Sequence, residues 1–367
     1  GINTALDRIE AKQPQRKLDL KKVIFSLVVA RFLRPSSKLC VFDQQLDQLY
    51  PEMFEHDIAL HHLYRAIDVL AAHKDDLESS LYWHGRDLLT ASVDVVLYDL
   101  TTLRFESTRE DLGELRRFGF SKEKRSDFTQ VVLGLLVDQY GIPLGFEVYP
   151  GNTFEGNTLQ DIVKKMAKKF KVRRFIFVAD RGLFSKKNIA ELKAHGGEFI
   201  VGMRLDQAKD RHAEFYDKTR FETLSDELAI LETTVGDDLC IITWSKKRDD
   251  RDKKVRSDIL RKMQKKLAKA KTPKEFVSNE NYRRFLKGLD AGQAPELDQA
   301  KIAQAEKRDG FFGILTNVKD KKAAELVTHY KELWKIEDAF GELKGTLKAR
   351  PIFHWKDHRI VGHLTMC

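Results

Sequence analysis

The sequence predicts an α/β protein: a mixed-sheet core, a helical N-terminal region and an inserted domain before the last helix of the core. Three observations support this prediction. Helical spacing of apolar residues dominates residues 1–90, and strand-like alternation begins after residue 91. The core pattern stops from 205 to 308 and resumes over 309–367. We therefore expect four segments: 1–90, 91–204, 205–308 and 309–367.

The N-terminal segment is predicted to be helical. Apolar residues between Val23 and Phe32 recur at spacings of three and four, and a second helix is expected over about 58–72. Pro35 and Pro51 interrupt the segment.

The first part of the core alternates between strands and helices. Strands are expected over 93–99, 131–137, 142–149, 175–179 and 199–203, with helices over 158–170 and 185–194. The first three strands have hairpin-like links and the later ones have helical crossovers, which implies a mixed sheet. This order is expected of an RNase H-like core.

The inserted domain contains the chain's excess of positive charge. Residues 246–274 hold 14 Lys or Arg and 4 Asp or Glu, a net +10 against +9 for the whole chain. An apolar stripe at Ile259, Leu260, Met263 and Leu267 predicts an amphipathic helix. We expect its basic face to follow a nucleic-acid backbone without reading bases, although such a run is also typical of a solvated helix face. The lysines concerned are Lys262, Lys265, Lys266 and Lys269.

The last segment is predicted to contain a strand over 311–316 and one long helix over 322–348. Another apparent helix, 358–366, runs to the end of the chain without a polar tail, so we expect this segment to be truncated.

Composition narrows the function only in part. A net charge of +9 and a pI near 9.2 favour a polyanionic partner, but a basic enzyme that never meets nucleic acid is about equally compatible. The three cysteines are widely spaced and indicate neither a zinc site nor a disulfide framework. The apolar run 23–33 is too short to span a bilayer, so a reducing, cytoplasmic compartment is expected.

Three carboxylates are the candidate catalytic residues. Asp99 ends the first predicted strand on an otherwise apolar face, and Asp180 ends the strand over 175–179. Glu337 lies at the border of the packing face of the long helix. Each has an ordinary alternative: a strand-end cap, a common turn and a solvated helix edge, respectively.

The combination is more specific than its parts. Two Asp at strand ends and one Glu on a late helix can converge beside one sheet, where divalent cations would relieve their repulsion. We expect Mg²⁺, for which Mn²⁺ may substitute, with Asp99, Asp180 and Glu337 as metal ligands. Two such ions can stabilise the attacking and leaving oxygens of a phosphodiester.

Around these residues the sequence resembles the DDE transposases of bacterial insertion sequences, namely the insertion sequence 4 group in its insertion sequence 1634 branch. Four segments up to the second Asp carry the resemblance. They are Tyr98-Asp99-Leu100-Thr101-Thr102; Gly119-Phe120-Ser121-Lys122 with Arg125 and Asp127; Pro150-Gly151-Asn152-Thr153 with Glu155 and Thr158; and Ala179-Asp180-Arg181-Gly182.

The third region of the family has the signature Tyr, two residues, Arg, three residues, Glu, six residues, Lys. Tyr330, Glu337 and Lys344 match at this spacing, whereas Leu333 occupies the Arg position. In the family this Arg contacts phosphate, and Leu333 cannot do so. Lys331 or Lys335 could take over the contact only from other faces of the helix. By this resemblance we expect Tyr330, Lys344, Lys122, Arg125 and Arg181 to bind DNA.

The resemblance implies a metal-dependent enzyme that cuts double-stranded DNA at the terminal inverted repeats of an element. The freed 3′-hydroxyl then attacks target DNA, in many relatives after a DNA hairpin has formed. A homodimer holding two element ends is implied as well. In relatives an aromatic residue of the inserted domain stacks on a flipped base, and Trp244 is the candidate here. A core Trp on a strand over 239–244 is at least as compatible.

Two alternatives remain open from the sequence. An RNase H-like nuclease without strand transfer would carry the same three carboxylates. A catalytically inactive, truncated DNA-binding remnant is favoured by the abrupt end and by Leu333.

Overall fold

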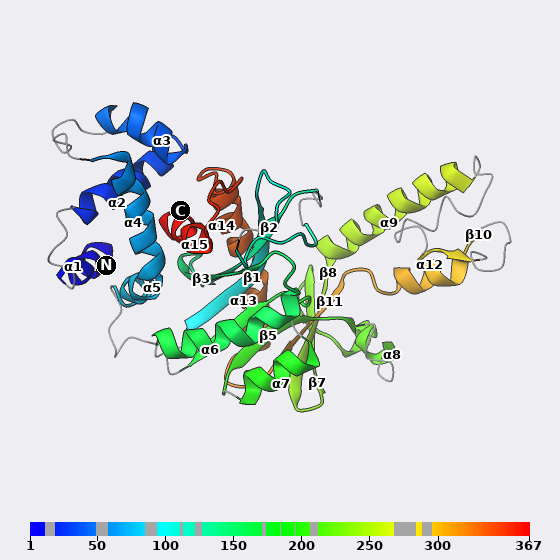
Figure 1. The fold of residues 1–367 in the computed structure, drawn as a ribbon. Helices are drawn as coiled ribbons and strands as arrows, with labels where there is room; N and C mark the ends of the chain where they lie inside the picture. Colours follow the sequence, from blue (N-terminus) through cyan, green and yellow to red (C-terminus); the bar gives the residue numbers. More distant parts are fainter. Residues whose placement is uncertain are drawn as a thin grey trace. The chain divides into compact units, whose positions relative to one another are not determined.

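The computed structural model (Figure 1) describes most of the chain. The residues it does not describe are 12–18, 49–57, 85–93, 111–112, 122–126, 171–173, 184, 195, 206–211, 268–283 and 288–295. The described residues form two compact units. Unit 1 comprises Gly1–Ile200 with His329–Cys367, and unit 2 comprises Val201–Thr328.

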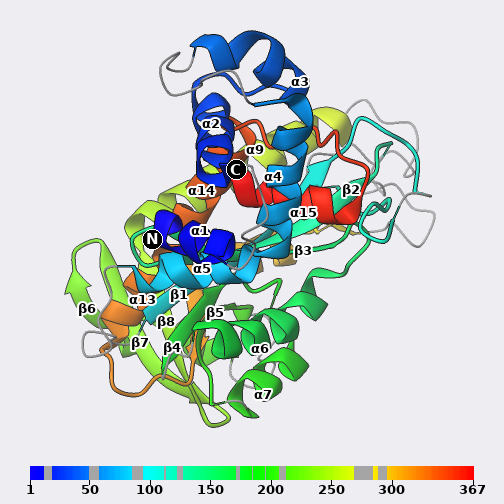
Figure 2. The same cartoon turned by 60° about the vertical axis from the view of Figure 1, so that its left-hand side comes forward.

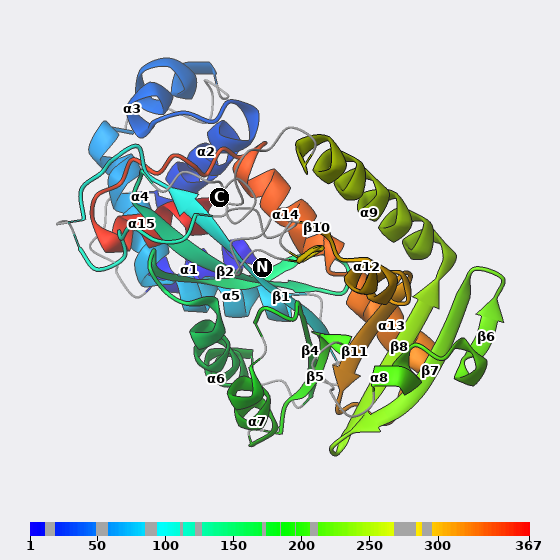
Figure 3. The same cartoon turned by 90° about the vertical axis from the view of Figure 1, so that its right-hand side faces the viewer.

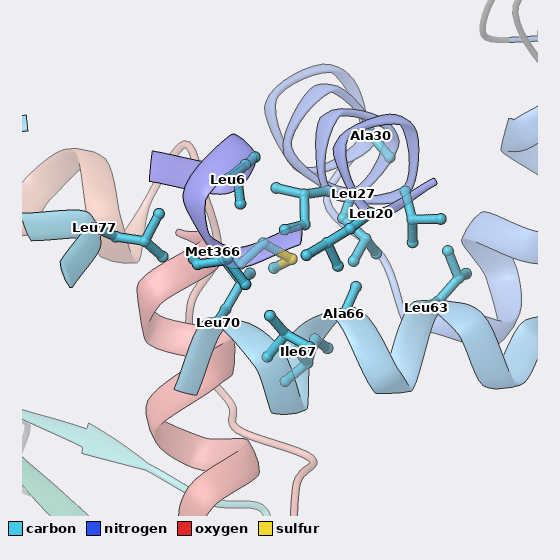
Figure 4. Packing of buried hydrophobic residues seen from close by; sticks show 14 of the residues in the cluster. Leu6, Leu20, Leu27, Ala30, Leu63, Ala66, Ile67, Leu70, Leu77 and Met366 are labelled. Carbon is cyan, nitrogen blue, oxygen red and sulfur yellow. The ribbon is translucent and has the colours of Figure 1, made fainter. Parts of the chain in front are cut away.

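Unit 1 begins with a helical bundle, as predicted. Its helices are α1 (Ile2–Ala11), α2 (Leu20–Leu33), α3 (Lys38–Cys40), α4 (Leu60–Ala72) and α5 (Lys74–Trp83), with a π-helical turn η1 (Val41–Gln45) and a 3₁₀ turn η2 (Leu46–Gln48). The last helix of the chain, α15 (Asp357–Met366), packs against α4 (Figure 2). One apolar cluster joins these helices, and it includes Leu27 of α2, Ile67 of α4 and Met366 of α15 (Figure 4). Met366 of α15 therefore belongs to the same apolar core as the N-terminal helices.

The sheet of unit 1 has the strand order β3-β2-β1-β4-β5. Its strands are β1 (Asp94–Arg104), β2 (Gln130–Asp138), β3 (Pro143–Pro150), β4 (Phe175–Ala179) and β5 (Glu198–Met203), which ends in unit 2. β1 pairs antiparallel with β2 and parallel with β4, and β2 pairs antiparallel with β3. The predicted RNase H-like mixed sheet is thus confirmed. Gly141, at φ +86°, lies in the turn between β2 and β3, where glycine adopts this backbone conformation without strain.

Helices cross between the later strands. A 3₁₀ turn η3 (Glu155–Asn157) leads into α6 (Thr158–Phe170), and α7 (Lys186–Ala194) follows β4. The Ser185 hydroxyl accepts the amide of Asn188 at 3.2 Å and so caps the start of α7.

β1 is longer than the sequence analysis expected. The strand continues past Asp99 to Arg104, because the residues after Asp99 keep pairing with β2 as far as Arg104↔Gln130. The prediction that Asp99 closes the strand was wrong: the β-branched pair Thr101-Thr102 extends it. Asp99 nevertheless marks the end of the part that pairs with β4, whose last pair is Tyr98↔Ala179.

The described part of unit 2 is built on the antiparallel order β11-β8-β7-β6 (Figure 3). Its strands are β6 (Glu222–Ser225), β7 (Leu228–Val235), β8 (Asp238–Ser245) and β11 (Phe311–Thr316), with a small pair β9 (Leu286–Lys287) and β10 (Glu296–Leu297). Its helices are α8 (His212–Phe215), η5 (Lys218–Arg220), α9 (Lys246–Leu267) and α12 (Gln299–Glu306).

The predicted basic amphipathic helix corresponds to α9. Met263 is fully buried, and Ile259, Leu260 and Leu267 pack beside it against Phe285 of the same unit. The apolar stripe is therefore confirmed.

The single helix predicted over 322–348 is two helices, α13 (Ala323–Lys331) and α14 (Trp334–Lys344). Between them the backbone bonds tighten to the i→i−3 pattern, with the amide of Leu333 donating to Tyr330 at 3.3 Å and that of Ile336 to Leu333 at 3.2 Å. The break contains neither Pro nor Gly, so periodicity alone could not locate it.

In the part of the chain that is described, no helix is long and apolar enough to cross a membrane.

Candidate active site

Asp99 and Asp180 occupy corresponding positions on neighbouring strands. Each directly follows the last paired residue of the parallel β1–β4 ladder, Tyr98 and Ala179 respectively. Adjacent strands lie about 4.8 Å apart, so the two backbones are neighbours at this point. Side chains alternate with period two, which puts Asp99 on the same sheet face as Val95 and Leu97. The sheet thus supplies two carboxylates at one edge of its parallel part.

Asp180 lies exposed at the end of a buried strand. One of its carboxylate oxygens accepts the Tyr330 hydroxyl at 3.2 Å and the amide of Arg181 at 2.8 Å. The Tyr330 contact links the second Asp to the end of α13, 150 residues later in the chain. Asp180 is therefore oriented by a residue of the Tyr/Glu/Lys signature.

α14 packs on β1 and β2 through its apolar side, where Ile336 and Phe340 are buried. Near its end, the Lys344 ammonium donates to the Thr101 hydroxyl at 2.6 Å. Thr101 lies two residues after Asp99 and so shares its face of β1. The helix thus touches the face of the first Asp through Lys344.

Glu337 lies between these two contacts along the chain. Its side chain is exposed, while the preceding Ile336 is buried, so it borders the packing face as the sequence indicated. It makes no hydrogen bond or ion pair with any residue that the structure describes. Leu333 is half-buried at the start of α14. Of the two lysines that could substitute for the Arg, Lys335 is bound to the carbonyl oxygen of Gln139 and to Glu332, and Lys331 is exposed.

The residues are suited to a hard divalent cation, although the carboxylates are not gathered into a closed cage. Across the described residues, no group of three His, Cys, Asp or Glu side chains is close enough together to hold a metal ion. The available donors are the carboxylate oxygens of Asp99, Asp180 and Glu337, the type that Mg²⁺ prefers. Asp99 and Asp180 come from neighbouring strands, and Glu337 projects from a helix packed on one of them. The type of donor fits the ion, but of the three candidate residues the structure brings only Asp99 and Asp180 onto adjacent strands, and it does not gather all three carboxylates at one point as the sequence predicted.

Behind the candidate site, hydroxyl groups fix β1 to α6. The buried Tyr98 hydroxyl donates to the Thr158 hydroxyl at 2.9 Å, and Tyr149 donates to Asp161 at 3.1 Å. Burial is the main cause that raises the pKa of both tyrosines. Both side chains remain neutral; Tyr98 fixes β1, the strand that carries Asp99, to α6, and Tyr149 fixes β3 to the same helix.

Two segments that carry the family resemblance cross in close contact. The Gln130 side-chain amide donates to the carbonyls of Gly151 at 2.9 Å and Phe120 at 3.1 Å. A Cβ at Gly119 would collide with the Gly151 carbonyl, and one at Gly151 with the Gln130 carbonyl. Glycine is therefore required at both positions by close backbone approach.

The remaining DNA-binding candidates are only partly described. Lys122, Arg125 and Lys269 lie outside the described residues. Arg181 is exposed beside Asp180, and three lysines are exposed on α9. These three are Lys262, Lys265 and Lys266.

Trp244 lies on β8, as expected, and is half-buried against the apolar cluster around Phe311. The Lys218 ammonium covers its ring at 3.8 Å from the centroid. A Cβ at Gly310 would collide with its indole. These contacts favour the packing role that the sequence left open, over a free stacking platform for a base.

Two positioning contacts were not predicted. Thr101 receives Lys344, and Lys335 ties α14 to the turn after β2. Thr101 lies within a segment that carries the family resemblance, and its position there could have identified it as a residue of the site. The contact of Lys335 with a main-chain carbonyl has no signature in the sequence.

The sequence of the chain matches the profile of a known protein family. The family profile described as "Transposase DDE domain" matches residues 92–367. No curated protein sequence matches the chain. One similar solved structure is a piggyBac transposase synaptic complex with hairpin DNA, at 10% sequence identity and a TM-score of 0.48, with 100% of this chain and 69% of that chain covered.

Proposed function

The chain belongs to the transposases with a DDE domain, and on this basis we propose that it cuts DNA at the ends of an insertion sequence and joins those ends to target DNA. The observation that carries the proposal is the pairing of β1 with β4, because it makes Asp99 and Asp180 neighbours. The finer assignment, to the insertion sequence 1634 branch of the insertion sequence 4 group, rests on the Tyr330, Glu337 and Lys344 spacing.

In this proposal Asp99, Asp180 and Glu337 hold Mg²⁺, or Mn²⁺ in its place. The metal would stabilise charge on the oxygens of the phosphodiester that is attacked. Tyr330 orients the Asp180 carboxylate by its hydrogen bond, and Lys344 lies at the same face of β1 through Thr101. Arg181 and the exposed lysines of α9 contact DNA phosphates. A homodimer would hold the two element ends.

The test is a cleavage and joining assay with linear duplex DNA that carries the element's terminal inverted repeats, in Mg²⁺ or Mn²⁺. Asp99→Asn and Glu337→Gln keep the side-chain size but remove the charge that binds metal. We expect each to lower cleavage at least about 100-fold, since metal stabilisation of the transition state contributes several kcal/mol. DNA binding in a mobility-shift assay should change little, because affinity comes mostly from phosphate contacts.

Asp338→Asn is the matched control. Asp338 is the exposed neighbour of Glu337 on α14, and this variant should cleave like the wild type. Full cleavage by Asp99→Asn would remove that residue from the site. Cleavage without joined products would indicate a nuclease, and binding without any cleavage would indicate an inactive remnant.

A further inference from the structure

A cavity of about 550 Å³ in unit 1 is separate from the three carboxylates and strongly cationic. Six Lys or Arg side chains line it, and none of the described residues around it is Asp or Glu. These six residues define the cationic cavity: Arg31, Lys38, Lys348, Arg350, Lys356 and Arg359. They come from α2 and α3, from the segment between α14 and α15, and from α15 itself.

Two of the cations are buried, and the part of the chain that the structure describes offers neither of them a carboxylate partner. Arg31 is 8% exposed and donates to the main-chain oxygens of Ser36 at 3.2 Å and Leu347 at 3.4 Å. Lys38 is 5% exposed, and its ammonium lies 3.3 Å from Nδ1 of His363. Neither forms an ion pair with a carboxylate among the residues described. Buried charges normally have a partner of opposite sign, so the cavity is electrostatically suited to an anion.

The neighbouring histidines do not supply the missing negative charge. Burial, followed by the positive field of Lys38, lowers the pKa of His354 to about 3. The same two causes hold the pKa of His363 well below its usual value. Both rings are neutral near pH 7, and Nε2 of His363 donates to the Ala349 carbonyl at 3.1 Å. Arg359, at the rim of the lining, is paired with the carboxylate of Asp68, at 2.9 and 3.1 Å.

The lining also includes two exposed aromatic side chains, Phe353 at 69% and Trp355 at 52%. Large aromatic surfaces beside cations are typical of proteins that bind single-stranded nucleic acid, where bases stack while the phosphates are neutralised. A duplex backbone is too stiff to bring its phosphates to cations as buried as Arg31 and Lys38. An unpaired strand can bend into the cavity.

The cavity is positioned to receive a strand that leaves the candidate active site. Ile352 donates to the carbonyl of Arg104 at 3.0 Å and bridges to Phe105, directly after the end of β1. Asp99 lies six residues earlier on this strand, roughly 20 Å away at about 3.3 Å per residue. That distance corresponds to a few nucleotides.

We propose that the cationic cavity binds one nucleotide of an unpaired DNA strand, with its phosphate at Arg31 and Lys38 and its base against Trp355 and Phe353. The inference rests on the proposed function only in taking DNA as the polymer. It requires neither metal nor cleavage.

The test measures binding of the full chain to a fluorescent single-stranded oligonucleotide and to the corresponding duplex, by anisotropy in EDTA. Trp355→Ala should lower single-strand affinity about 5- to 100-fold, the range for loss of one base–aromatic stack. Duplex affinity should change less than about twofold. Trp355→Phe retains an aromatic face and should recover most of the single-strand affinity.

Tyr140→Ala is the matched control, because Tyr140 is an exposed aromatic residue on the β2–β3 turn outside the cavity lining. It should bind both DNAs like the wild type. An equal loss of affinity for both DNAs in Trp355→Ala, or no loss for either, would overturn the proposal. A competition experiment gives one more outcome that would overturn it: a free deoxynucleotide displaces the oligonucleotide fully, while Trp355→Ala binds the oligonucleotide like the wild type.

The two proposals fail separately. If Asp99→Asn cleaves normally but single-strand binding depends on Trp355, the catalytic assignment is wrong and the cavity stands. If cleavage depends on the three carboxylates but Trp355→Ala binds single strands normally, only the cavity is refuted.

Discussion

Helix α9 and the cationic cavity are both rich in lysine and arginine, but their charges are arranged in opposite ways. On α9 many cations have acidic partners: Lys253 binds Asp249 at 2.7 Å, and Arg256 binds Asp309 at 2.5 Å. The three exposed lysines Lys262, Lys265 and Lys266 lie near its end. In the cavity, fewer cations converge, and Arg31 is buried with only neutral partners.

Because of this difference, the two basic regions are expected to interact with a polyanion in different ways. Exposed charges on a helix act over a distance and are screened by salt, so they attract any polyanion. Buried, converging charges without partners discriminate by shape and desolvation. The segment with the largest net charge is therefore not the one expected to select a DNA form.

The largest expected effect concerns the part of α9 that is structural. Arg256→Met would leave the buried carboxylate of Asp309 without its partner. We expect a loss of about 3–5 kcal/mol in the free energy of unfolding, measured by urea denaturation. Arg261→Met breaks an exposed pair with Asp258 and should cost at most about 1 kcal/mol. Equal costs for the two variants would contradict the division of α9 into buried and solvent-facing cations.

The next effect concerns the outward face of α9. Replacing Lys262, Lys265, Lys266 and Lys269 with Gln should weaken binding to all DNA sequences alike. Each phosphate contact contributes about 0.9 to the slope of log affinity against log salt, so the slope should flatten by up to roughly 3–4 units. Titrations of duplex DNA at several salt concentrations give the slope. Parallel slopes with equal affinities would mean that this face does not contact DNA.

A smaller and more selective effect is expected in the cavity. Arg31→Met removes a charged hydrogen-bond donor, which should lower single-strand affinity about 10- to 100-fold. Duplex affinity should stay within about twofold, in contrast to the α9 variant. Lys187→Gln removes an exposed cation of α7 and serves as the control. A thermal melt must show that the Arg31 variant is folded; a folded variant with unchanged single-strand affinity would contradict the assignment.

The smallest effect is a pH dependence of stability. Burial, then repulsion by Arg31, lowers the pKa of Lys38 to about 7. The groups facing it are Arg31, His354, His363 and Cys367. Because the folded pKa lies below the unfolded value near 10.5, the unfolded chain binds more protons above pH 7. Stability should therefore rise with pH, by about 1 kcal/mol between pH 7 and 8.

Lys38→Met should remove this rise, as measured by urea denaturation at each pH. Lys187→Gln should retain it. A wild-type protein whose stability is flat across this range would mean that Lys38 is not desolvated.

Sequence periodicity predicted the fold well where side chains report burial directly. The strands of the unit 1 sheet, the basic helix and the β11 strand all lie where their apolar patterns indicated. The far end of β1 was missed because Thr101 and Thr102 are polar yet buried. The strands β6 and β7 were missed because many of their side chains are exposed.

The sequence predicted which residues belong to the candidate site, but not the contacts that they make. Asp99 and Asp180 were identified from strand ends, which the parallel register supports. The cationic cavity had no sequence signal: Arg31 and Lys38 lie more than 300 residues from Lys348 and its neighbours. Summing charge along the chain located α9 and concealed the cavity, because the cavity's cations are divided between two segments that lie far apart in the sequence.

The break between α13 and α14 changes the directions in which the signature residues point. In a continuous α-helix, seven residues turn through about 700°, which leaves Tyr330 and Glu337 about 20° apart in azimuth. A 3₁₀ turn advances about 120° per residue in place of about 100°, so two such residues carry the phase about 40° further. Glu337 then lies about 20° on the other side of Tyr330. The spacing of seven residues between Tyr330 and Glu337 is thus only a distance along the chain. The angle between the hydroxyl and the carboxylate is set by the local 3₁₀ turn, which the spacing does not reveal.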